Sequence, residues 1–591
     1  MVRVKKKRRN DTEDRRQQSP DRKAGHAAFS RLLTSPVYRE RQPLWNAGFL
    51  AIAVIALLLP FAGKAFNMDD PLFIWTARQI LDHPADFFGF QVNWYGHEQP
   101  MYEVMKNPPL TAYFIALVAF LFGFGEVPLH IAFLSVAVAA AVGIYFLARE
   151  LCPSPLLAAL AGVLTPAFLV SSNTIMCDIP MLACWIWAVV FWIHGLKEDR
   201  TLYYFIASVL ICFSMLNKYF GLSLVPLLFA YAWAEKRSMG RWAFFLLIPL
   251  AVTGFYELLT GMMYGRGLFS DAIFYPILRR PDDDVRFISQ GVISLAFMGG
   301  GFLSAFFLVP YLCSWRVFTA GLALTAGIFL VLSALPNIGD FPLRDGIRAG
   351  VVFQLSVFAV TGLIIIAVAA TDLIKNKDSG SLLLFLWILG TFLFAAFVNW
   401  TTNIRAILPV APAVGILIMR RIYGGETDPL LKSKTPLPFL LLAGALLAFF
   451  TVWADASLAN TVRSAASGIA KKYGDGGRPL WFQGHWGFQY YMQNEGGKPI
   501  DYTRTALEKG ARIVIPLNNA NLKTMPRETF EFTGNVDQDP VRWLTTMSLG
   551  SGAGFYSKTS GPLPFVLGIG SPERYVVVTM TAPLQYSSQQ Q

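Results

Sequence analysis

The chain has little charge for its length. Of its 591 residues, only 15% are Asp, Glu, Lys or Arg, whereas 54% are hydrophobic. A soluble core of this size does not need so many apolar residues, so the composition excludes a soluble globular protein. It indicates instead an α-helical protein that crosses a membrane many times.

Cysteine is also scarce. The five cysteines lie within or beside apolar segments, at Cys152, Cys177, Cys184, Cys212 and Cys313. None lies in the polar C-terminal region, which excludes a disulfide framework there, and their spacing fits no metal site. The sequence shows no internal repeat of the kind that many transporters carry.

Basic residues gather at the N-terminus. Residues 1–46 hold thirteen Lys and Arg and five Asp and Glu, which supplies most of the net charge of +12. A basic run can bind nucleic acid. Next to a long apolar segment it is more typical of a disordered tail that stays in the cytoplasm and touches anionic membrane lipid. We therefore predict membrane lipids, and no nucleic acid, as its partners.

Fourteen apolar segments are long enough, or nearly so, to cross a bilayer, which takes about 20 helical residues. They lie near 47–66, 109–125, 128–148, 155–172, 179–195, 202–217, 219–234, 242–261, 291–313, 316–335, 349–371, 381–399, 405–419 and 437–455. The first segment has no small-residue cleavage site, so we predict a retained helix rather than a signal peptide.

The distribution of Lys and Arg decides whether segment 109–125 crosses. If it lies at the outer surface, the inner short loops hold thirteen Lys and Arg and the outer short loops hold eight. If it crosses, the bias reverses and violates the positive-inside rule. We therefore predict about 13 transmembrane helices, with 109–125 as an outer juxtamembrane helix.

This topology divides the chain into three parts. Residues 1–46 form a cytoplasmic tail, residues 47–455 a transmembrane domain with a long first outer loop at 65–108, and residues 456–591 a small extracytoplasmic α/β domain. In that last part, "ARIVIPL" and "RYVVVTM" indicate strands and "TRTALEKG" a short helix. The predicted location is a bacterial-type inner (plasma) membrane, with the C-terminal domain periplasmic or extracellular.

Two adjacent acids, Asp69 and Asp70, follow the first span directly. Asp70 precedes Pro71, so it suits the N-cap of a helix. Asp69 has no such structural reason. A carboxylate at a membrane edge, beside a helix N-terminus, can accept a proton from a substrate hydroxyl. The alternative for Asp69 is a solvated loop acid.

Three further charged residues reach the same outer side in this topology. Asp178 begins a span next to a proline, where a capping role and a functional role are equally open. Lys218 lies between two short apolar runs, where lysines commonly snorkel. Arg405 lies at the outer end of a span, where anion binding is the default hypothesis. The long first outer loop adds His97, Glu98, Glu103 and Lys106.

Taken in order, these motifs resemble those of GT-C membrane glycosyltransferases, in particular glycosyltransferase family 39, the group of protein mannosyltransferases and aminoarabinose transferases. The motifs are the acidic pair, "NPPL" at 107–110, "DIPML" at 178–182, "NKYFGL" at 217–222 and "RAILP" at 405–409. "GHWGFQYYM" at 484–492 is similar to the outer C-terminal segment of bacterial members. The chain departs from the usual Asp-Glu pair, and from the usual Thr-Lys-Gly signature at 217–219.

The resemblance implies a GT-C fold and the transfer of a sugar, with inversion, from a polyprenyl-phosphate carrier to a hydroxyl group of a protein, lipid or glycan. The candidate catalytic residues are Asp69, Asp70 and Asp178, of which Asp69 would be the base and Asp70 the second acid of the family's pair. Asp178 would support Asp69 or orient the acceptor, and Arg405 and Lys218 would bind the donor phosphate.

The remaining implications concern the first outer loop and cofactors. His97, Glu103 and Lys106 are possible contacts of the acceptor or of the loop. The resemblance implies no certain cofactor, and it leaves open whether a divalent metal bridges Asp69 and Asp178.

Two other classes of protein fit a polytopic chain. A transporter or a scramblase for lipid-linked sugars also places charges at depth, but it favours inverted repeats and broken helices near the midplane. A polytopic anchor that presents an external binding domain leaves the long first outer loop unexplained. The clustering of the candidate charges at one face favours the transferase.

Overall fold

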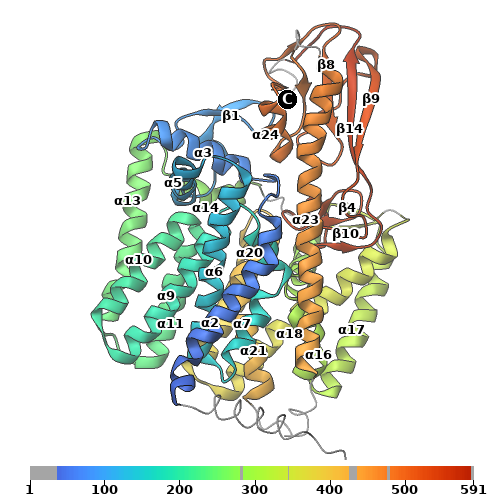
Figure 1. Cartoon of the computed structure of the whole chain (residues 1–591). Helices are drawn as coiled ribbons and strands as arrows, with labels where there is room; N and C mark the ends of the chain where they lie inside the picture. The colour runs from blue at the N-terminus through green and yellow to red at the C-terminus, as the bar shows by residue number, and fades with distance from the viewer. Residues whose placement is uncertain (1–35, 280–283, 344, 425–435, 475–478, 587–591) are drawn as a thin grey trace, which may run out of the picture. The chain divides into compact units, whose positions relative to one another are not determined.

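The computed structural model describes residues 36–279, 284–343, 345–424, 436–474 and 479–586 (Figure 1). The chain divides into two compact units, residues 1–49 and residues 50–591. Most of the predicted basic tail and the last five residues lie outside the described residues. The second unit contains the first outer loop, most of the membrane helices and the C-terminal domain.

Nine of the predicted spans coincide with helical stretches that are long and apolar enough to cross a bilayer. Within the described residues these stretches are Gln42–Phe61, Glu126–Leu151, Asp178–Glu198, Trp242–Tyr264, Trp315–Ser333, Arg348–Asn376, Ser379–Val398, Ile404–Tyr423 and Leu437–Tyr473. The fold is therefore that of a polytopic α-helical membrane protein, as the composition predicts.

These stretches contain the long helices of Figure 1. They are α2 (Pro36–Leu58), α6 (Glu126–Leu151), α9 (Asp178–Glu198), α12 (Trp242–Phe245) with α13 (Leu247–Tyr264), α17 (Trp315–Ser333), α18 (Arg348–Asn376), α19 (Ser379–Leu393), α20 (Ile404–Ile407) with α21 (Ala411–Tyr423), and α23 (Leu437–Tyr473).

Two predicted spans are broken rather than straight. The helices α7 (Pro155–Val163) and α8 (Pro166–Ser172) meet at 66°. The helices α15 (Asp284–Gly301) and α16 (Leu303–Leu312) meet at a bend of 91°. Pro166 stands at the first break, where its fixed backbone suits the start of a new helix.

Three further apolar helices are short. They are α10 (Thr201–Asn217) with 17 residues, and α11 (Leu224–Lys236) and α5 (Leu110–Phe122) with 13 each. A helix of 13 residues spans about 20 Å, less than the ~30 Å hydrocarbon core. Figure 1 shows α5 beside α3 (Asp70–Asp82) of the first outer loop. Helix α5 alone is therefore too short to cross the hydrocarbon core, and the juxtamembrane position of 109–125 stays a prediction.

Two glycines allow the membrane helices α15 and α18 to cross closely. A Cβ on Gly299 of α15 would lie 2.0 Å from the carbonyl oxygen of Phe358 in α18, and one on Gly362 of α18 would lie 2.1 Å from that of Leu295. Only glycine fits such a crossing. This is the packing by small residues that membrane helices use, because burial from lipid brings little hydrophobic gain.

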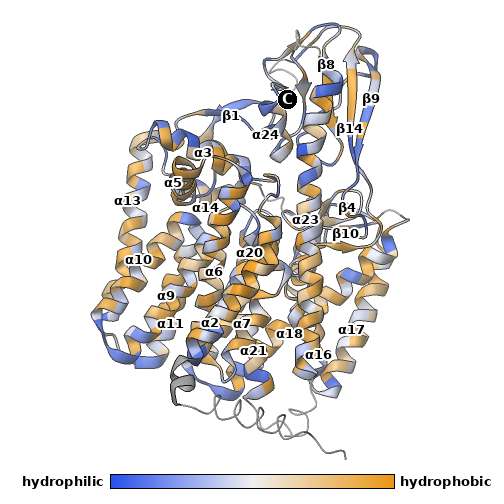
Figure 2. Ribbon diagram, in the orientation of Figure 1, coloured by the Kyte–Doolittle hydropathy of each residue, from blue (hydrophilic) through white to orange (hydrophobic). Residues whose placement is uncertain are grey.

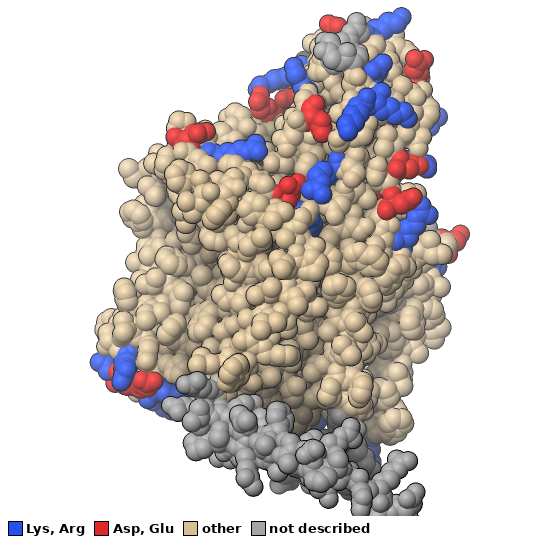
Figure 3. All heavy atoms as spheres, in the orientation of Figure 1, with Lys and Arg blue, Asp and Glu red and all other residues tan. Residues whose placement is uncertain are grey.

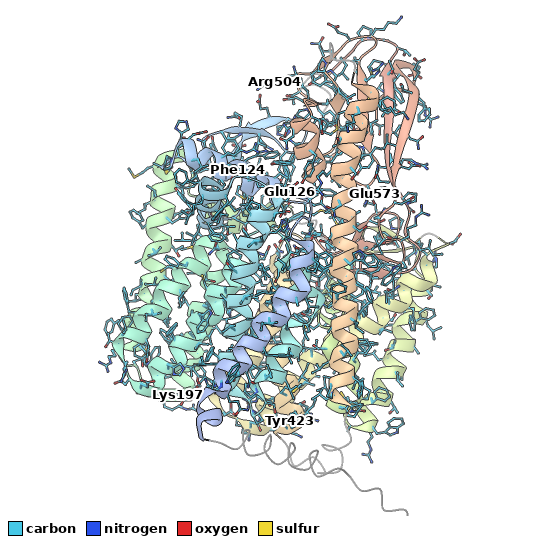
Figure 4. The ribbon with its side chains drawn as sticks, viewed as in Figure 1. Phe124, Glu126, Lys197, Tyr423, Arg504 and Glu573 are labelled. Carbon is cyan, nitrogen blue, oxygen red and sulfur yellow. The ribbon has the colours of Figure 1, made fainter. Side chains whose placement is uncertain are left out.

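The charges lie at the two ends of the helices. Figure 2 shows apolar residues along the membrane helices, and Figure 3 shows a broad band without charged side chains between the two ends on this face. In Figure 4, Lys197 and Tyr423 lie near one end, and Phe124 and Glu126 lie nearer the end that carries the C-terminal domain. Such a band is typical of a surface that contacts lipid.

Basic residues of several predicted inner loops lie together at one end of the described helices. There Lys197 pairs with Glu150, and Arg241 pairs with Asp199 at 2.7 Å. Arg420 binds the carbonyl oxygen of Leu151. The outer-loop residues lie at the opposite end, with the C-terminal domain, so the loops separate as the charge count predicts.

The C-terminal domain is joined to the membrane helices by one continuous helix, α23. Helix α23 has 37 residues, or about 55 Å, and so exceeds the hydrocarbon core by far. The predicted boundary at residue 456 falls within this helix, so α23 continues from the predicted transmembrane part into the C-terminal part. Hydropathy marks where α23 leaves the lipid, and it does not mark where the helix ends.

Beyond α23, the domain is built on a five-stranded mixed sheet. Its order is β6 (Lys498–Pro499), β5 (Trp481–Phe482), β8 (Arg512–Pro516), β14 (Glu573–Met580) and β9 (Phe530–Gln538), with β5 parallel to both neighbours and β14 antiparallel to both. The strands predicted from "ARIVIPL" and "RYVVVTM" are β8 and β14. One helix, α24 (Trp486–Asn494), precedes β6.

The helix predicted from "TRTALEKG" is wrong. The carboxylate of Asp501 accepts bonds from the backbone N–H and the hydroxyl of Thr503, which turns the chain. The following residues form β7 (Ala506–Leu507), paired with β15 (Leu584–Gln585). Leu507 is buried in the core of the domain, and this tertiary contact overrides the local helix preference.

The remaining short elements lie in loops or at helix ends. They are η1 (Leu59–Phe61), β1 (Gln91–Asn93), β2 (Glu98–Pro100), α4 (Met101–Val104), η2 (Tyr219–Ser223), α14 (Leu268–Arg279), β3 (Asn337–Ile338), β4 (Phe341–Pro342), η3 (Phe394–Val398), η4 (Leu408–Val410), η5 (Arg527–Thr529), β10 (Leu544–Thr545), β11 (Met547–Ser548), β12 (Ala553–Gly554) and β13 (Val566–Leu567).

The orientation in the membrane is open to a direct test. We expect a periplasmic reporter to be active when fused after Tyr473, at the end of α23, and inactive when inserted near the exposed Met239. The physical reason is the excess of Lys and Arg on the Met239 side. The measurement is enzymatic activity of alkaline phosphatase fusions, normalised to fusion abundance. The reverse pattern would place the acidic pair in the cytoplasm.

Candidate functional site

The candidate residues from four separate parts of the chain meet at one cavity. The cavity has a volume of about 660 Å³ and lies among α3, α9, η2, α14 and α19. Its polar end is lined by Asp69, Lys106, Asn107, Asp178, Lys218, Asn399, Asn403 and Arg405. The sequence order of the motifs therefore reflects a common site in space.

Four of these side chains form a continuous chain of opposite charges. Arg405 Nη2 lies 2.8 Å from Asp69 Oδ2, and Arg405 Nη1 lies 3.7 Å from Asp178 Oδ2. Lys218 Nζ lies 2.6 Å from the other oxygen, Asp178 Oδ1. Asp178 is 1% exposed, whereas Asp69 is 32% exposed. Asp69 is thus the carboxylate that a ligand in the cavity can reach.

Of the two roles left open for Asp178, capping is not observed, and Lys218 is paired with Asp178 instead of snorkelling freely. Helix α9 begins at Asp178 itself, and no side chain caps its N-terminus. The Asp178 carboxylate points to the two cations instead. Removing a buried carboxylate from water costs several kcal/mol unless cations lie beside it, so Lys218 and Arg405 make its position possible.

Asp70 faces away from the cavity. It is 0% exposed, and its two oxygens accept the backbone N–H groups of Asn67 and Ile175, each at 2.9 Å. The predicted N-cap is wrong, because the helix begins at Asp70 and the carboxylate reaches back and across instead. Burial raises the pKa of Asp70 to about 6, although nearby Lys64 and the two N–H groups lower it. Asp70 therefore fixes the local backbone.

The backbone before Asp69 is held by the C-terminal part of the chain. The N–H of Phe66 binds the hydroxyl of Tyr491 in α24 at 2.9 Å. The N–H of Ala65 binds the side chain of Asn460 in α23 at 3.0 Å. Gly487 allows the contact, since a Cβ there would lie 2.2 Å from the carbonyl oxygen of Phe66. The "GHWGFQYYM" segment thus positions the catalytic candidate rather than contacting the cavity.

A buried ion pair strengthens this attachment. Lys64, 1% exposed, lies 2.6 Å from Asp455, which is 2% exposed. Lys64 also donates to the carbonyl oxygen of Asn173 at 2.9 Å, in the loop that precedes Asp178. One ammonium group therefore joins α23 to both segments that carry acids of the site.

Sequence reasoning missed this pair. Lys64 and Asp455 each lie near the end of a predicted apolar segment, 47–66 and 437–455. A charged residue within an apolar segment is itself a signal, because it needs a partner. Nothing in the sequence matches the two residues to each other across 391 positions.

The first outer loop contributes one of its three predicted contacts to the cavity. Lys106 lines the cavity and lies 2.5 Å from Asp271 of α14. Glu103 lies 3.8 Å from Arg266 and is not part of the lining. His97 is half-buried in the turn between β1 and β2 and is not part of the lining either.

The other end of the cavity is apolar. It extends between η2 and α11 on one side and α19 with η3 on the other, lined by Trp185, Phe220, Leu222, Pro226, Leu227, Leu386, Trp387, Gly390, Phe394 and Val398. The neighbouring surface exposes Phe229, Leu393 and Val398. A cavity with convergent charges at one end and an apolar wall at the other suits an amphipathic ligand.

The site offers few ligands for a metal. Within the described part of the chain, no group of three or more His, Cys, Asp and Glu side chains is close enough to hold an ion. Arg405 occupies the space between Asp69 and Asp178 that a bridging cation would take. A divalent metal would therefore need Arg405 to move and would need oxygen ligands from its substrate.

The two acids of the pair are expected to differ in what they do for folding. Asp70→Asn keeps one acceptor oxygen and turns an NH₂ group toward a buried backbone N–H. An unpaired buried donor costs about 1–3 kcal/mol. We therefore expect a clearly lower Tm for Asp70→Asn than for Asp69→Asn, measured by intrinsic fluorescence in nanodiscs. Equal values of Tm would contradict the structural role of Asp70.

Several solved structures are similar to this chain at low identity. They include the apo oligosaccharyltransferase of Archaeoglobus fulgidus, with 12% identity and a TM-score of 0.47 over 78% of this chain and 65% of that chain. They also include apo ArnT of Cupriavidus metallidurans, with 16% identity and a TM-score of 0.39 over 80% and 93%. The chain spans less than two thirds of the archaeal protein. With TM-scores below 0.5, these similarities decide nothing about the site.

Sequence comparison gives one further result. No curated protein sequence matches the chain. A family model does, described as dolichyl-phosphate-mannose-protein mannosyltransferase, over residues 106–258. The match covers about a quarter of the chain and includes Asp178 and Lys218, but neither Asp69 nor Arg405. Residues 106–258 are therefore similar to a family of membrane glycosyltransferases, which confirms the resemblance that the motifs predict.

Proposed function

We propose that the chain is a glycosyltransferase that moves a sugar from a polyprenyl-phosphate carrier to a hydroxyl group of a protein, lipid or glycan acceptor. The observation that carries the proposal is the charged chain from Asp69 through Arg405 and Asp178 to Lys218, set at the polar end of an otherwise apolar cavity. A phosphate with a long hydrocarbon tail matches this cavity, because it too is charged at one end and apolar along the rest. The matched family is named for such a donor and for a protein acceptor.

The donor phosphate would bind between Arg405 and Lys218. Arg405 presents a planar fork of donors, and its buried Nε has no hydrogen-bond partner among the described residues. Lys218 supplies a second cation, 20% exposed and part of the cavity lining. Both groups would stabilise the charge that grows on the phosphate as it leaves the sugar, an effect that is strong in a water-poor site.

The hydrocarbon tail would lie in the apolar end of the cavity. Leu227 of α11 and Leu386 and Trp387 of α19 line it. Because this end reaches toward lipid-facing side chains, the tail can pass from the cavity into the bilayer. Hydrocarbon gains little energy by leaving lipid, so the tail would guide the donor, and the charges would supply the selectivity.

Asp69 would serve as the general base. It lines the cavity and is the more exposed of the two carboxylates in the charged chain. In the proposed step the acceptor oxygen attacks the anomeric carbon, Asp69 takes the hydroxyl proton, and the bond between carbon and phosphate oxygen breaks. Attack opposite to the leaving phosphate inverts the anomeric centre. Phosphate leaves readily, so the step needs no general acid.

Asp178 would hold the two cations rather than take the proton. Its side chain is 1% exposed and lies against both Lys218 and Arg405. Such a carboxylate keeps the phosphate-binding groups in place and balances their charge before the donor arrives. Glu103 and His97 would contact the acceptor outside the cavity, and Lys106 would contact it at the rim.

The positive charge of the site would come from Arg405 and Lys218, with a divalent metal as the alternative. A metal would bridge Asp69 and Asp178 only after Arg405 had left its place between them. The location follows from the charge distribution: the site and the C-terminal domain would face the outer side of a bacterial-type inner membrane. The structure has two broken helix pairs, α7 with α8 and α15 with α16, as a transporter can have. A transporter or scramblase still finds less support, because the four charged side chains gather at a single cavity.

The base assignment has a direct test. We expect Asp69→Asn to lose about 10²–10⁴ in turnover, because the amide has nearly the same size but takes up no proton. The measurement is the release of labelled sugar from a panel of polyprenyl-phosphate sugars by purified protein in proteoliposomes. Asp82→Asn is the matched control, since Asp82 is an exposed acid at the end of α3, the helix that Asp69 precedes.

Two results would count against the assignment. Turnover by Asp69→Asn within about threefold of wild type is far smaller than the loss expected for a base. Equal losses in Asp69→Asn and Asp82→Asn would show a general effect on the first outer loop instead. Release of no sugar by the wild-type protein across the panel would contradict the proposed function itself.

A further inference from the structure

A loop of the C-terminal domain pairs with the backbone that carries Arg405. The N–H of Ile404 donates to the carbonyl oxygen of Phe555 at 3.0 Å, and the N–H of Lys558 donates to that of Thr402 at 2.9 Å. The hydroxyls of Thr401 and Ser557 lie 3.0 Å apart. The segment between η3 and α20 is thus held by hydrogen bonds to the 555–558 loop of the C-terminal domain.

Tyr556, in the middle of that loop, turns its side chain toward the site. Its side chain is 5% exposed. The Arg405 guanidinium carbon lies 5.8 Å from the centre of its ring, within the range of a cation–π interaction. Its hydroxyl donates to Asp455 Oδ2 at 2.9 Å. One side chain therefore contacts both Arg405 and a buried carboxylate of α23.

Asp455 connects the two members of the Asp69–Arg405 pair. Its carboxylate accepts bonds from Tyr556, from Thr546 at 2.9 Å, and from Lys64 at 2.6 Å. Lys64 begins the short segment that leads to Asp69, and Tyr556 reaches Arg405. The same carboxylate thus fixes the backbone before the proposed base and the ring beside the proposed phosphate ligand.

We propose that Tyr556 is a positioning residue for Arg405 and that the C-terminal domain thereby completes the donor site. The inference rests on the proposed function of Arg405 as a phosphate ligand. Asp69 and Met176 hold two of the guanidinium nitrogens, and the Tyr556 ring lies against the group as a third support. Without the ring, the Arg405 guanidinium can rotate more freely. Phosphate binding must then restrict that rotation, and the lost entropy lowers the affinity for phosphate.

The ring and the hydroxyl have different roles in this account. The ring contacts Arg405, so Tyr556→Leu removes the positioning contact. Tyr556→Phe keeps the ring and loses the bond to Asp455, which retains Lys64 and Thr546. We therefore expect Tyr556→Phe to restore most of the donor affinity that Tyr556→Leu loses, although both variants lose stability.

The experiment measures the affinity of the full-length protein in nanodiscs for a fluorescent polyprenyl phosphate without a sugar. We expect Tyr556→Leu to raise Kd by about 3–30-fold, the range of a cation–π interaction. Tyr556→Phe should stay within about threefold of wild type. Tyr575→Leu is the matched control: Tyr575 is 3% exposed in the same domain, and its ring packs against Phe488 and not against Arg405. It should lose stability and keep its Kd.

A double-mutant cycle separates positioning from a general structural effect. In an Arg405→Ala background, Tyr556→Leu should change Kd by less than about twofold, because the group that it positions is gone. Equal effects in both backgrounds would overturn the inference, as would an unchanged Kd in Tyr556→Leu. If Tyr556→Leu does not fold, Tyr556→Met serves the same cycle, since it too lacks a ring and fills space adaptably.

Failure of the inference differs from failure of the proposed function. If Arg405→Ala weakens binding and Tyr556→Leu does not, the inference fails and the function stands. If wild-type protein does not bind the probe, or if Arg405→Ala binds it as wild type does, the proposed role of Arg405 fails, and the inference is overturned with it.

Discussion

The pairing of Arg405 with two carboxylates is the interaction on which the site depends. A guanidinium at the edge of a membrane is costly, and so is a carboxylate with 1% exposure. Together, and with Lys218, they become tolerable. The same arrangement holds two positive groups next to an acid that the cavity leaves partly exposed. The stability of the buried charges therefore requires the same close arrangement of these four residues as the proposed chemistry does.

That pairing requires four segments that are far apart in the sequence to hold their side chains at fixed positions relative to one another. Asp69 follows the first span, Asp178 begins α9, Lys218 directly follows α10, and Arg405 lies in α20. Membrane helices alone set such positions only through their packing. Here the C-terminal part of the chain adds direct bonds: α23 and α24 hold the backbone before Asp69, and the 555–558 loop holds the backbone before Arg405.

Much of this could be predicted from the sequence because membrane insertion leaves a strong pattern. Long apolar runs gave the spans, and the bias of Lys and Arg between loops separated the two ends. Asp69, Asp178, Lys218 and Arg405 stood out because charges beside apolar runs are rare and need a reason. The structure brings all four to one cavity.

Other features lay beyond the sequence because they depend on partners. Asp70 looked like a helix cap, yet its partners are the N–H groups of Asn67 and Ile175, the second of them more than a hundred residues away. Lys64, Asp455 and Tyr556 carry no motif, and contact alone defines their role. The continuation of α23 past residue 456 was missed for a related reason, since hydropathy detects contact with lipid and does not detect where a helix ends.

The central claim is that the cavity holds the phosphate and the tail of a polyprenyl-phosphate donor. Photo-crosslinking with a polyprenyl phosphate that carries a diazirine in its tail tests it most directly, with the sites mapped by mass spectrometry. We predict labels on α11 and α19, near Leu227 and Trp387, that decrease in Arg405→Ala. Helix α17, which has no buried residues, serves as the internal reference for chance contact with lipid. Equal labelling of α17 and α19, unchanged in Arg405→Ala, would contradict the account.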